Sequence, residues 1–492
     1  MKSVVFLQND VESLLPELFL ALAILVVLLH GAFMVIPATS LSTLLTPSLS
    51  RLTSLALIFT SALVLNNPLL GQSICHSAFV LDALGNTAKF LSLLALLACV
   101  VLGQNYLEST GISAYEVFVL ILIASLSLCF LLSSYDLLSV YLSLEMLSLV
   151  FYTLACLKRD SAFSTEAALK YFILGALASA FFLFGSSLIY AYMGTTNFAQ
   201  LALLSQDLEP RPLIVNLGIV FVASTFFFKL GGAPFHMWVP DVYEGAPTSF
   251  SQVFAVVPKL SLLVVLSRFF YTAFWSFSPT WEILLLLCGA MSLYIGCMGG
   301  LAQTKLKRLL AYSGISHVGF MCAAMSTGCL EGNQGVFFYA FLYMLTTIYL
   351  WTYAMHLEPA RRGLLTLVDS IGVFQANPVL ALTTVLVLFS LAGIPPLGGF
   401  FAKLNVFVSL IESSYYLVAL IAVVCSVIST FYYIRMVKIL YFEKAYTWGF
   451  FPPMSKVKGG LMGLCAGLLI FFLLGPNLFY YLSYKMSLSL FA

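Results

Sequence analysis

Long apolar runs recur along almost the entire chain and are separated by short stretches that are polar or rich in glycine and proline. A run of about 20 apolar residues is long enough to cross a bilayer as a helix. The pattern predicts about fourteen such segments, at residues 15–36, 51–68, 79–103, 114–133, 136–156, 165–192, 213–238, 248–275, 281–300, 305–328, 335–356, 377–409, 415–440 and 459–484. The expected fold is therefore an all-α polytopic membrane protein.

The composition supports a membrane protein and excludes a water-soluble one. Of the 492 residues, 61% are hydrophobic and 9% are charged, whereas soluble domains carry about 25% charged residues. So few polar side chains cannot cover the surface of a soluble globule, and we expect membrane lipids around the chain. The net charge of +2 gives no indication of a nucleic-acid partner.

Motifs for bound metals, clusters or nucleotides are missing from the sequence. The ten cysteines include no CxxC pair and do not follow zinc or iron–sulfur spacing. Neither a GxGxxG nor a Walker motif occurs. We therefore expect this chain to bind no metal and no cofactor, and to form no disulfide.

Basic residues in short loops indicate how the chain is oriented in the membrane. Loops that follow odd-numbered segments carry twelve of them: Arg51, Lys158, Arg159, Lys305, Lys307, Arg308, Arg361, Arg362, Lys438, Lys444, Lys456 and Lys458. The opposite side carries four: Lys2, Arg211, Arg268 and Lys485. The odd loops are expected to face the cytoplasm or mitochondrial matrix, and both termini the opposite, intermembrane-space side.

Two of the predicted segments are interrupted in a similar way. Segment seven contains Lys229 beside GGAP, and segment twelve contains AGIPPLGGFFAKL. The two are five segments apart and so cross in opposite directions, as two inverted repeats of segments four to eight and nine to thirteen would. Paired broken helices in inverted halves point to an ion or substrate site. The expected units are an N-terminal three-helix segment (1–110), a first repeat (111–277), a second repeat (278–445) and a C-terminal helix (446–492).

Five ionisable residues lie well inside the predicted segments: Glu145, Lys229, Lys259, His317 and Lys403. A charge at bilayer depth costs at least about 2.5–3.5 kcal/mol, so residues of this kind are usually functional. Structural explanations stay open. Glu145 and Lys229 could form an ion pair between two helices. Lys259 or Lys403 could extend to the surface, and His317 could be a hydrogen-bonded core residue.

The functional interpretation of these residues is proton transfer. Burial disfavours the charged form of a lysine and a nearby carboxylate favours it, so a lysine under both influences can hold or release a proton as the neighbouring charge changes. A broken helix adds unpaired backbone groups and a cavity that water can enter. Lys229 beside GGAP is therefore predicted to be a switchable proton site, at one point of a path made of lysines, a histidine and water.

Five blocks of sequence follow one another in a specific order: SLEMLSLVFY, STEAALKYFILGALASAFFLFG, FFFKLGGAPFHMWVPDVYEGAPT, QTKLKRLLAYSGISHVGF and AGIPPLGGFFAKL. In this order they resemble the antiporter-like membrane subunits of respiratory complex I, in particular the family of NADH dehydrogenase subunit 2. The resemblance is strong over residues 110–445. It implies fourteen transmembrane helices with two inverted repeats, and proton translocation driven by NADH oxidation and ubiquinone reduction. NADH, FMN, iron–sulfur clusters and ubiquinone would be bound by partner subunits.

The resemblance also implies roles for individual residues. Glu145 matches the family's glutamate on helix five, and Lys229 its lysine partner on broken helix seven. Lys259 matches the central lysine on helix eight, and Lys403 the terminal lysine on helix twelve. A further lysine of helix six and two histidines, whose roles the resemblance leaves open, match Lys170, His236 and His317.

At two places the sequence does not settle whether the roles implied by the family apply. Lys170 lies one turn after Glu166, where an interfacial i,i+4 ion pair is as good an explanation as a functional role. Related subunits often carry a lysine on helix eleven, where this chain has only hydroxyls: Tyr339, Tyr343, Thr346 and Thr347. If protons cross there, waters and hydroxyls must take the place of that lysine.

The sequence also favours a cellular location. The three N-terminal segments resemble the bacterial and the plant or algal forms of the family, and PFHMW together with the tail KMSLSLFA favours a mitochondrial form. The chain is therefore expected in the mitochondrial inner membrane, beside other membrane-arm subunits that include neighbouring antiporter-like subunits. The alternatives are a subunit of a multi-subunit cation/proton antiporter, a structural scaffold for other subunits, and a solitary transporter.

Overall fold

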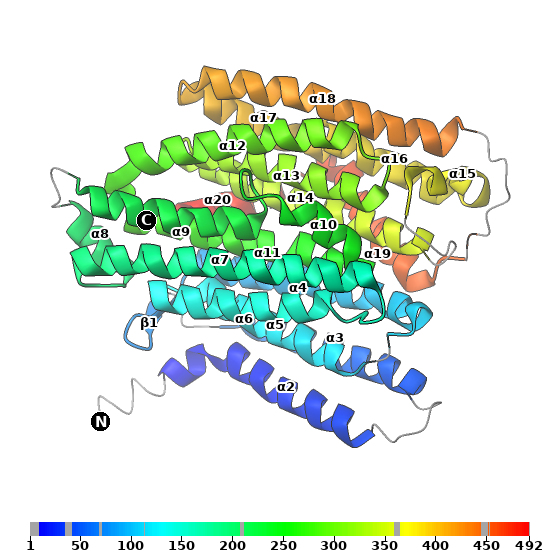
Figure 1. Cartoon of the computed structure of the whole chain (residues 1–492), viewed down its shortest axis with the longest axis horizontal. Coiled ribbons are helices and arrows are strands. Elements are labelled where there is room, and N and C mark those ends of the chain that lie inside the picture. Colours follow the sequence, from blue (N-terminus) through cyan, green and yellow to red (C-terminus); the bar gives the residue numbers. More distant parts are fainter. Residues whose placement is uncertain are drawn as a thin grey trace.

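The computed structural model describes residues 9–34, 42–67, 71–112, 114–206, 211–358, 365–443, 451 and 453–491. Most of them form helices that lie roughly parallel to one another in one bundle (Figure 1). Helix α2 (Leu15–Met34) lies at one edge of the bundle and α18 (Tyr416–Tyr441) at the other. Four basic residues of the predicted charge asymmetry lie outside the described residues: Lys2, Arg361, Arg362 and Lys444.

Twelve helices in the described part of the chain are long and apolar enough to cross a membrane. This confirms a multi-pass all-α membrane protein, whereas the exact number of fourteen crossings is not confirmed. Segments one to six correspond to α2, α3 (Ser42–Leu65), α4 (Ala83–Thr110), α5 (Glu116–Ser133), α6 (Leu137–Ala155) and α7 (Ala162–Met193). Segments eight to eleven correspond to α11 (Thr248–Ser267), α12 (Ser278–Leu301), α13 (Leu306–Met325) and α14 (Leu330–Leu357), and segment thirteen to α18.

Segments seven and twelve are both broken helices, as the sequence predicts. Segment seven consists of α9 (Leu213–Leu230) and α10 (Trp238–Gly245), and segment twelve of α16 (Pro378–Ala392) and α17 (Gly398–Glu412). Each first half ends at a glycine in the left-handed conformation, Gly231 with φ +76° and Gly393 with φ +85°. In Figure 1, α9 leads to the right toward α10, whereas α16 leads back to the left toward α17. The two broken helices therefore run in opposite directions, as inverted repeats require.

Several elements differ from the predicted segments. Residues 79–81 belong to a hairpin of β1 (Gln72–Ile74) and β2 (Phe79–Leu81). Helix α4 begins only after them, at Ala83, where Asp82 caps it by accepting a hydrogen bond from the Gly85 amide. Segment fourteen is divided into α19 (Lys456–Ile470) and α20 (Asn477–Phe491) at Pro476, which has no amide hydrogen for a helical bond. Further short elements are α8 (Phe198–Gln206), η1 (Arg268–Ala273), η2 (Trp275–Phe277), η4 (Leu367–Ser370), α15 (Val373–Ala376) and η5 (Phe471–Leu474).

The middle of the bundle is formed by α11 and α14, which pack against each other. Every residue of α11 is buried, because α4, α5, α6, α9 and α14 surround it. Helix α14 is covered in turn by α13, α17 and α20. A polar side chain on either central helix is therefore far from lipid and needs a partner inside the protein.

Candidate functional site

Lys229 lies in the last turn of α9, directly before the first helix break. A cation is favoured there by the partial negative charge of the helix C-terminus. The Lys229 Nζ donates a hydrogen bond to the hydroxyl of Tyr152 on α6 at 3.4 Å and lies 5.7 Å from the centre of that ring. A Cβ added at Gly231 would lie 2.5 Å from Cγ2 of Val239. The break beside Lys229 is therefore tightly packed and depends on glycine.

Glu145 and Lys229 do not form a direct ion pair: among the described residues, no nitrogen–oxygen contact within 4.0 Å joins them. Instead, Ser148 donates a hydrogen bond from its Oγ to Glu145 Oε2 at 3.3 Å. Ser148 lines a cavity together with Lys229, and Tyr152 follows one turn later on the same face of α6. The carboxylate is thus connected to the ammonium through two hydroxyls.

Lys259 lies on the buried central helix α11 and faces α14. Its Nζ donates a hydrogen bond to the Tyr343 hydroxyl at 2.5 Å and lies 4.3 Å from the centre of the Tyr343 ring. A Cβ added at Gly314 of α13 would lie 3.1 Å from both the Lys259 Nζ and the Tyr343 hydroxyl. The ammonium is therefore held by a hydroxyl and a ring face in a closely packed environment.

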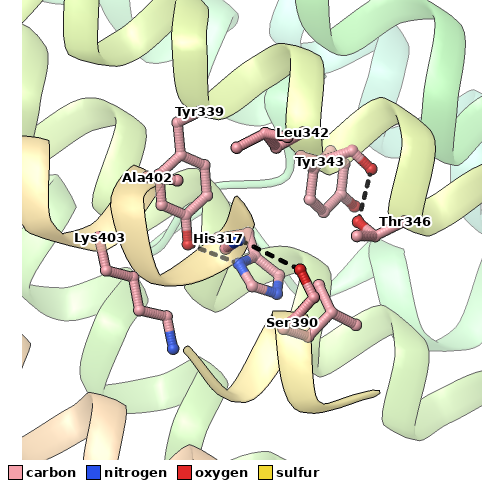
Figure 2. A pocket seen from close by; sticks show the side chains of 10 residues that line it. His317, Tyr339, Leu342, Tyr343, Thr346, Ser390, Ala402 and Lys403 are labelled. Carbon is pink, nitrogen blue, oxygen red and sulfur yellow. Dashed lines mark hydrogen bonds between the residues drawn. The ribbon is translucent and has the colours of Figure 1, made fainter. Parts of the chain in front are cut away.

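His317 lies on α13, and both of its ring nitrogens contact tyrosine hydroxyls; Figure 2 shows the contact with Tyr339. The Nδ1 atom lies 2.8 Å from the Tyr339 hydroxyl and Nε2 lies 3.2 Å from the Tyr433 hydroxyl. The His317 ring centre is 5.3 Å from that of Tyr343, the residue that binds Lys259. Tyr339 and Tyr343 both lie on α14, and both contact His317. The hydroxyls of Thr346 and Thr347 bind the Tyr343 carbonyl.

Lys403 lies on α17, just beyond the second helix break. Its Nζ donates a hydrogen bond at 2.9 Å to the carbonyl oxygen of Ala392, the last residue of α16. A carbonyl at a helix end has no partner within its own helix, so the break supplies the acceptor. Lys403 also lines a cavity of about 20 Å³ with His317 and Tyr343 (Figure 2). That space suffices for about one water molecule.

The five predicted residues thus form two clusters with α11 between them. The Lys229 cluster consists of Glu145, Ser148, Tyr152 and Lys229. The His317 cluster consists of Lys259, Tyr343, His317, Tyr339, Tyr433 and Lys403. Phe254 and Pro258 of α11 line the Lys229 cavity, also about 20 Å³ in volume, whereas Lys259 faces Tyr343. Among the described residues no direct hydrogen bond joins the two clusters.

Lys170 and His236 lie outside both clusters. Lys170 Nζ forms ion pairs with Glu166 at 2.8 Å and with Asp241 of α10 at 2.9 Å, and its side chain is 44% exposed. The predicted i,i+4 pair is therefore present, with a second carboxylate from another helix. His236 lies in the break between α9 and α10, is 5% exposed, and has no hydrogen-bond partner for its Nδ1.

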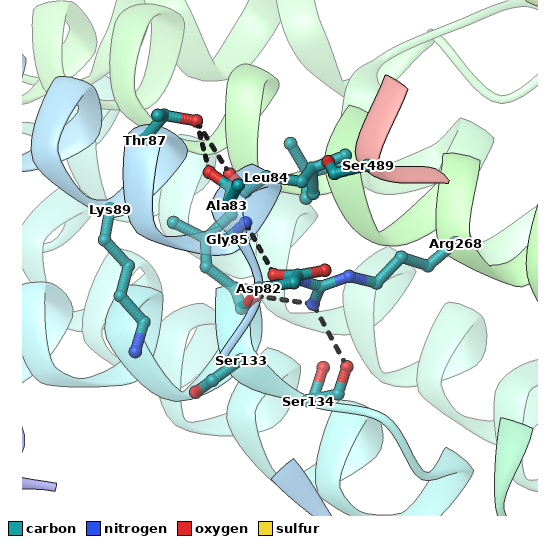
Figure 3. A network of polar contacts seen from close by, with 12 residues as sticks. Asp82, Ala83, Leu84, Gly85, Thr87, Lys89, Ser133, Ser134, Arg268 and Ser489 are labelled. Carbon is teal, nitrogen blue, oxygen red and sulfur yellow. Dashed lines mark hydrogen bonds and ion pairs between the residues drawn. The ribbon is translucent and has the colours of Figure 1, made fainter. Parts of the chain in front are cut away.

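Several buried charges were missed by the sequence analysis. Lys89 of α4 and Glu17 of α2 form an ion pair at 2.6 Å, and each side chain is 2% exposed. Lys89 lies inside the predicted segment 79–103 and could have been identified in the same way as Lys229. Arg268 was counted with the loop residues but is 1% exposed and forms an ion pair with Asp82 at 2.5 Å (Figure 3). It also donates a hydrogen bond to the Leu132 carbonyl. Its guanidinium links the end of α11 to Asp82 at the start of α4 and to Leu132 in the last turn of α5.

The described residues contain no group of three or more His, Cys, Asp or Glu side chains that could hold a metal ion. The side chains that the fold brings together are instead lysines, a histidine and hydroxyls, and all of them exchange protons or form hydrogen bonds. Their arrangement in a packed interior with room for single waters is suited to stepwise proton transfer.

Comparisons with known proteins identify the family of the chain. The family described as NADH:quinone oxidoreductase/Mrp antiporter, TM, matches residues 134–429. NADH-ubiquinone oxidoreductase chain 2 of Marchantia polymorpha is 38% identical over 98% of this chain and 99% of its own length. The protein of the same name from Arabidopsis thaliana is 36% identical over 97% of this chain and 96% of its own length.

Solved structures show the same fold. A chain of respiratory complex I from Thermus thermophilus with bound aureothin has a TM-score of 0.78 and 29% identity over 94% of this chain and 98% of its own. A chain of the Mrp complex from Dietzia sp. has a TM-score of 0.81 and 19% identity over 98% of both chains. From this full-length similarity and the fold, the chain belongs to the NADH-ubiquinone oxidoreductase chain 2 family, within the wider group of NADH:quinone oxidoreductase and Mrp antiporter membrane subunits.

Proposed function

We propose that this chain is a proton-translocating membrane-arm subunit of respiratory complex I, in which other subunits oxidise NADH and reduce ubiquinone. The observation that carries the proposal is the His317 cluster. It places two buried lysines, Lys259 and Lys403, on either side of a histidine whose two nitrogens both contact hydroxyls. Buried ionisable groups of this kind inside a membrane protein mark proton or ion paths.

Each link of the proposed path has its own chemical task. The protonated Lys229 is stabilised by the hydroxyl of Tyr152 and, through Ser148, by the charge of Glu145. A change of charge near Glu145 alters how strongly Lys229 holds its proton. The proton affinity of Lys259 then changes in turn, and His317 with its tyrosines passes the proton toward Lys403. Because α11 separates the two clusters, the step from Lys229 to Lys259 requires water or an electrostatic effect across that helix.

The surroundings of the chain follow from this role. We propose that residues 111–277 and 278–445 act as two inverted half-channels, with the basic loops on the matrix side and both termini on the intermembrane-space side of the mitochondrial inner membrane. Neighbouring antiporter-like subunits would lie beside it, and lipids would cover its exposed apolar surface. NADH, FMN, iron–sulfur clusters and ubiquinone would be bound in partner subunits, not in this chain.

Native electrophoresis of gently solubilised membranes tests the assignment. The chain should migrate, as identified by mass spectrometry, with a very large assembly that oxidises NADH in the gel. Migration in a smaller assembly without NADH oxidation would contradict the proposal. A cation/proton antiporter subunit, which the family name also covers, would then be the better assignment.

A further inference from the structure

Two of the sequence blocks, FFFKLGGAPFHMWVPDVYEGAPT and QTKLKRLLAYSGISHVGF, meet through their charged residues. Glu244 of α10 binds Lys305 at 2.5 Å, and its other oxygen contacts the Nε of Arg308. Arg308 also binds Asp241 of α10 at 2.6 Å. We refer to Asp241, Glu244, Lys305 and Arg308 as the α10–α13 ion cluster. None of these residues belongs to either proton-transfer cluster, so their close arrangement needs another explanation.

The α10–α13 ion cluster is more than a surface ion pair. The Glu244 side chain is 8% exposed although its partners are about one-third exposed. Both of its oxygens are bound by cations, the arrangement that gives the strongest hydrogen bonds to a carboxylate. Cavities of about 110 Å³ and 130 Å³ adjoin it, and Glu244 and Lys305 line both. These volumes are large enough for several waters, so the cluster borders space that water can enter.

Helix α10 connects this cluster with the Lys229 cluster. It has 8 residues and is therefore only about 12 Å long. At its start, Trp238 donates a hydrogen bond to the Phe228 carbonyl at 2.9 Å and lines the cavity of Lys229. At its end, a Cβ added at Gly245 would lie 2.5 Å from the carbonyl oxygen of Phe163. With both ends closely packed, a shift of one end is transmitted to the other.

Helix α13 connects the same cluster with the His317 cluster. Arg308 and His317 are both on α13, nine residues or about 13.5 Å apart along the axis. Glu244 and Asp241 belong to the first proposed repeat, and Lys305 and Arg308 to the second. The ion cluster is thus a polar contact between the repeats that bypasses α11.

We propose that the α10–α13 ion cluster positions α10 against α13 and thereby couples the Lys229 cluster to the His317 cluster. Asp241, Glu244, Lys305 and Arg308 are positioning residues, because they touch neither cluster directly. The proposal rests on the proposed proton-pumping function. It adds a mechanical and electrostatic connection between the half-channels at the end of the bundle where Lys305 and Arg308 lie.

The test compares Glu244→Gln, Arg308→Gln and the double variant in isolated membranes, with NADH-driven proton uptake normalised to the amount of assembled complex. Each single variant should lower uptake per complex about five-fold or more, since a charge-assisted contact is lost. The double variant should be no worse than either single one, because both remove the same coupling. Glu244→Asp, which keeps the charge, should recover part of the uptake. The matched control is Glu443→Gln, which breaks the exposed Lys438–Glu443 pair and should pump normally.

Several outcomes would overturn the proposal. Normal uptake per assembled complex in both single variants would show that the cluster is not needed. Additive losses in the double variant would show that the two residues act separately. If Glu244→Gln prevents assembly, Lys305→Gln on the more exposed side of the cluster is the substitute, and normal uptake in that variant would also overturn the proposal.

A parallel Lys229→Ala variant separates this inference from the proposed function. Loss of uptake in Lys229→Ala together with normal uptake in the cluster variants would contradict the coupling role alone. Normal uptake in assembled Lys229→Ala would contradict the pumping function itself.

Discussion

Replacing Lys259 by methionine should lower NADH-driven proton pumping about a hundred-fold, as expected when a positioned proton-transfer group is removed. Lys259 is the only ionisable residue of α11 itself, and its Nζ is held by the Tyr343 hydroxyl. Methionine has nearly the same length and volume and fits an apolar site, so the helix should stay packed. The loss should appear as less proton uptake in membranes whose amount of assembled complex is unchanged.

A Lys259→Arg variant distinguishes proton exchange from the mere presence of charge. Arginine keeps a positive charge but does not release its proton in proteins. If Lys259 carries protons, Lys259→Arg should pump as poorly as Lys259→Met. Recovery of pumping by arginine would show that a fixed charge suffices, and normal pumping by assembled Lys259→Met would remove Lys259 from the path.

Breaking the ion pair between Glu17 and Lys89 should strongly destabilise the N-terminal three helices. Both side chains are 2% exposed and lie 2.6 Å apart, and Glu17 Oε2 has no further partner. Removing one member of a buried pair leaves an unpaired charge and costs about 3–5 kcal/mol. Glu17→Gln or Lys89→Met alone should therefore lower the thermal stability and the yield of the assembled complex.

The double variant Glu17→Gln/Lys89→Met should recover most of that loss, because replacing both members of a buried pair is often nearly neutral. Its proton pumping per complex should equal that of the unmodified protein, since the pair belongs to neither proton-transfer cluster. A single variant as stable as the unmodified protein would contradict the structural role. Full assembly with poor pumping in the double variant would instead place the pair in the proton path.

Most of the fold could be predicted from hydropathy because each spanning helix must satisfy its own backbone. The broken helices were also predictable, since Gly231 and Gly393 stand beside prolines in otherwise apolar runs. Hydropathy failed where an apolar stretch is not a spanning helix. Residues 79–81 are as apolar as their neighbours but pair as a strand, and Pro476 divides a run that was predicted as one segment.

The candidate site could be predicted only in part. An ionisable residue in an apolar run is conspicuous, so Lys229, Lys259 and Lys403 were found individually. Tyr339 and Tyr343 were also noted as hydroxyls on their helix, but which group each side chain binds was not predictable, because these contacts are made across the fold. Tyr433 reaches His317 over a sequence separation of 116 residues. No local pattern contains that information.

The sequence also could not predict how the charges of Glu145 and Lys229 are connected to each other. Glu145 and Lys229 were expected to interact from their types and their helices, but the geometry inserts Ser148 and Tyr152 between them. Tyr152→Phe would remove this connection without changing any charge. The distinction matters because a hydroxyl-mediated contact transmits a change of charge and can also pass a proton.

The most direct test of proton translocation by this chain is NADH-driven proton uptake by Lys229→Ala, measured per assembled complex in sealed membranes. The Lys229 Nζ stands at the helix break between the hydroxyl of Tyr152 and the cavity shared with Ser148. We predict that uptake falls about ten-fold or more while the complex assembles in normal amounts. Normal uptake by the assembled variant would contradict the account.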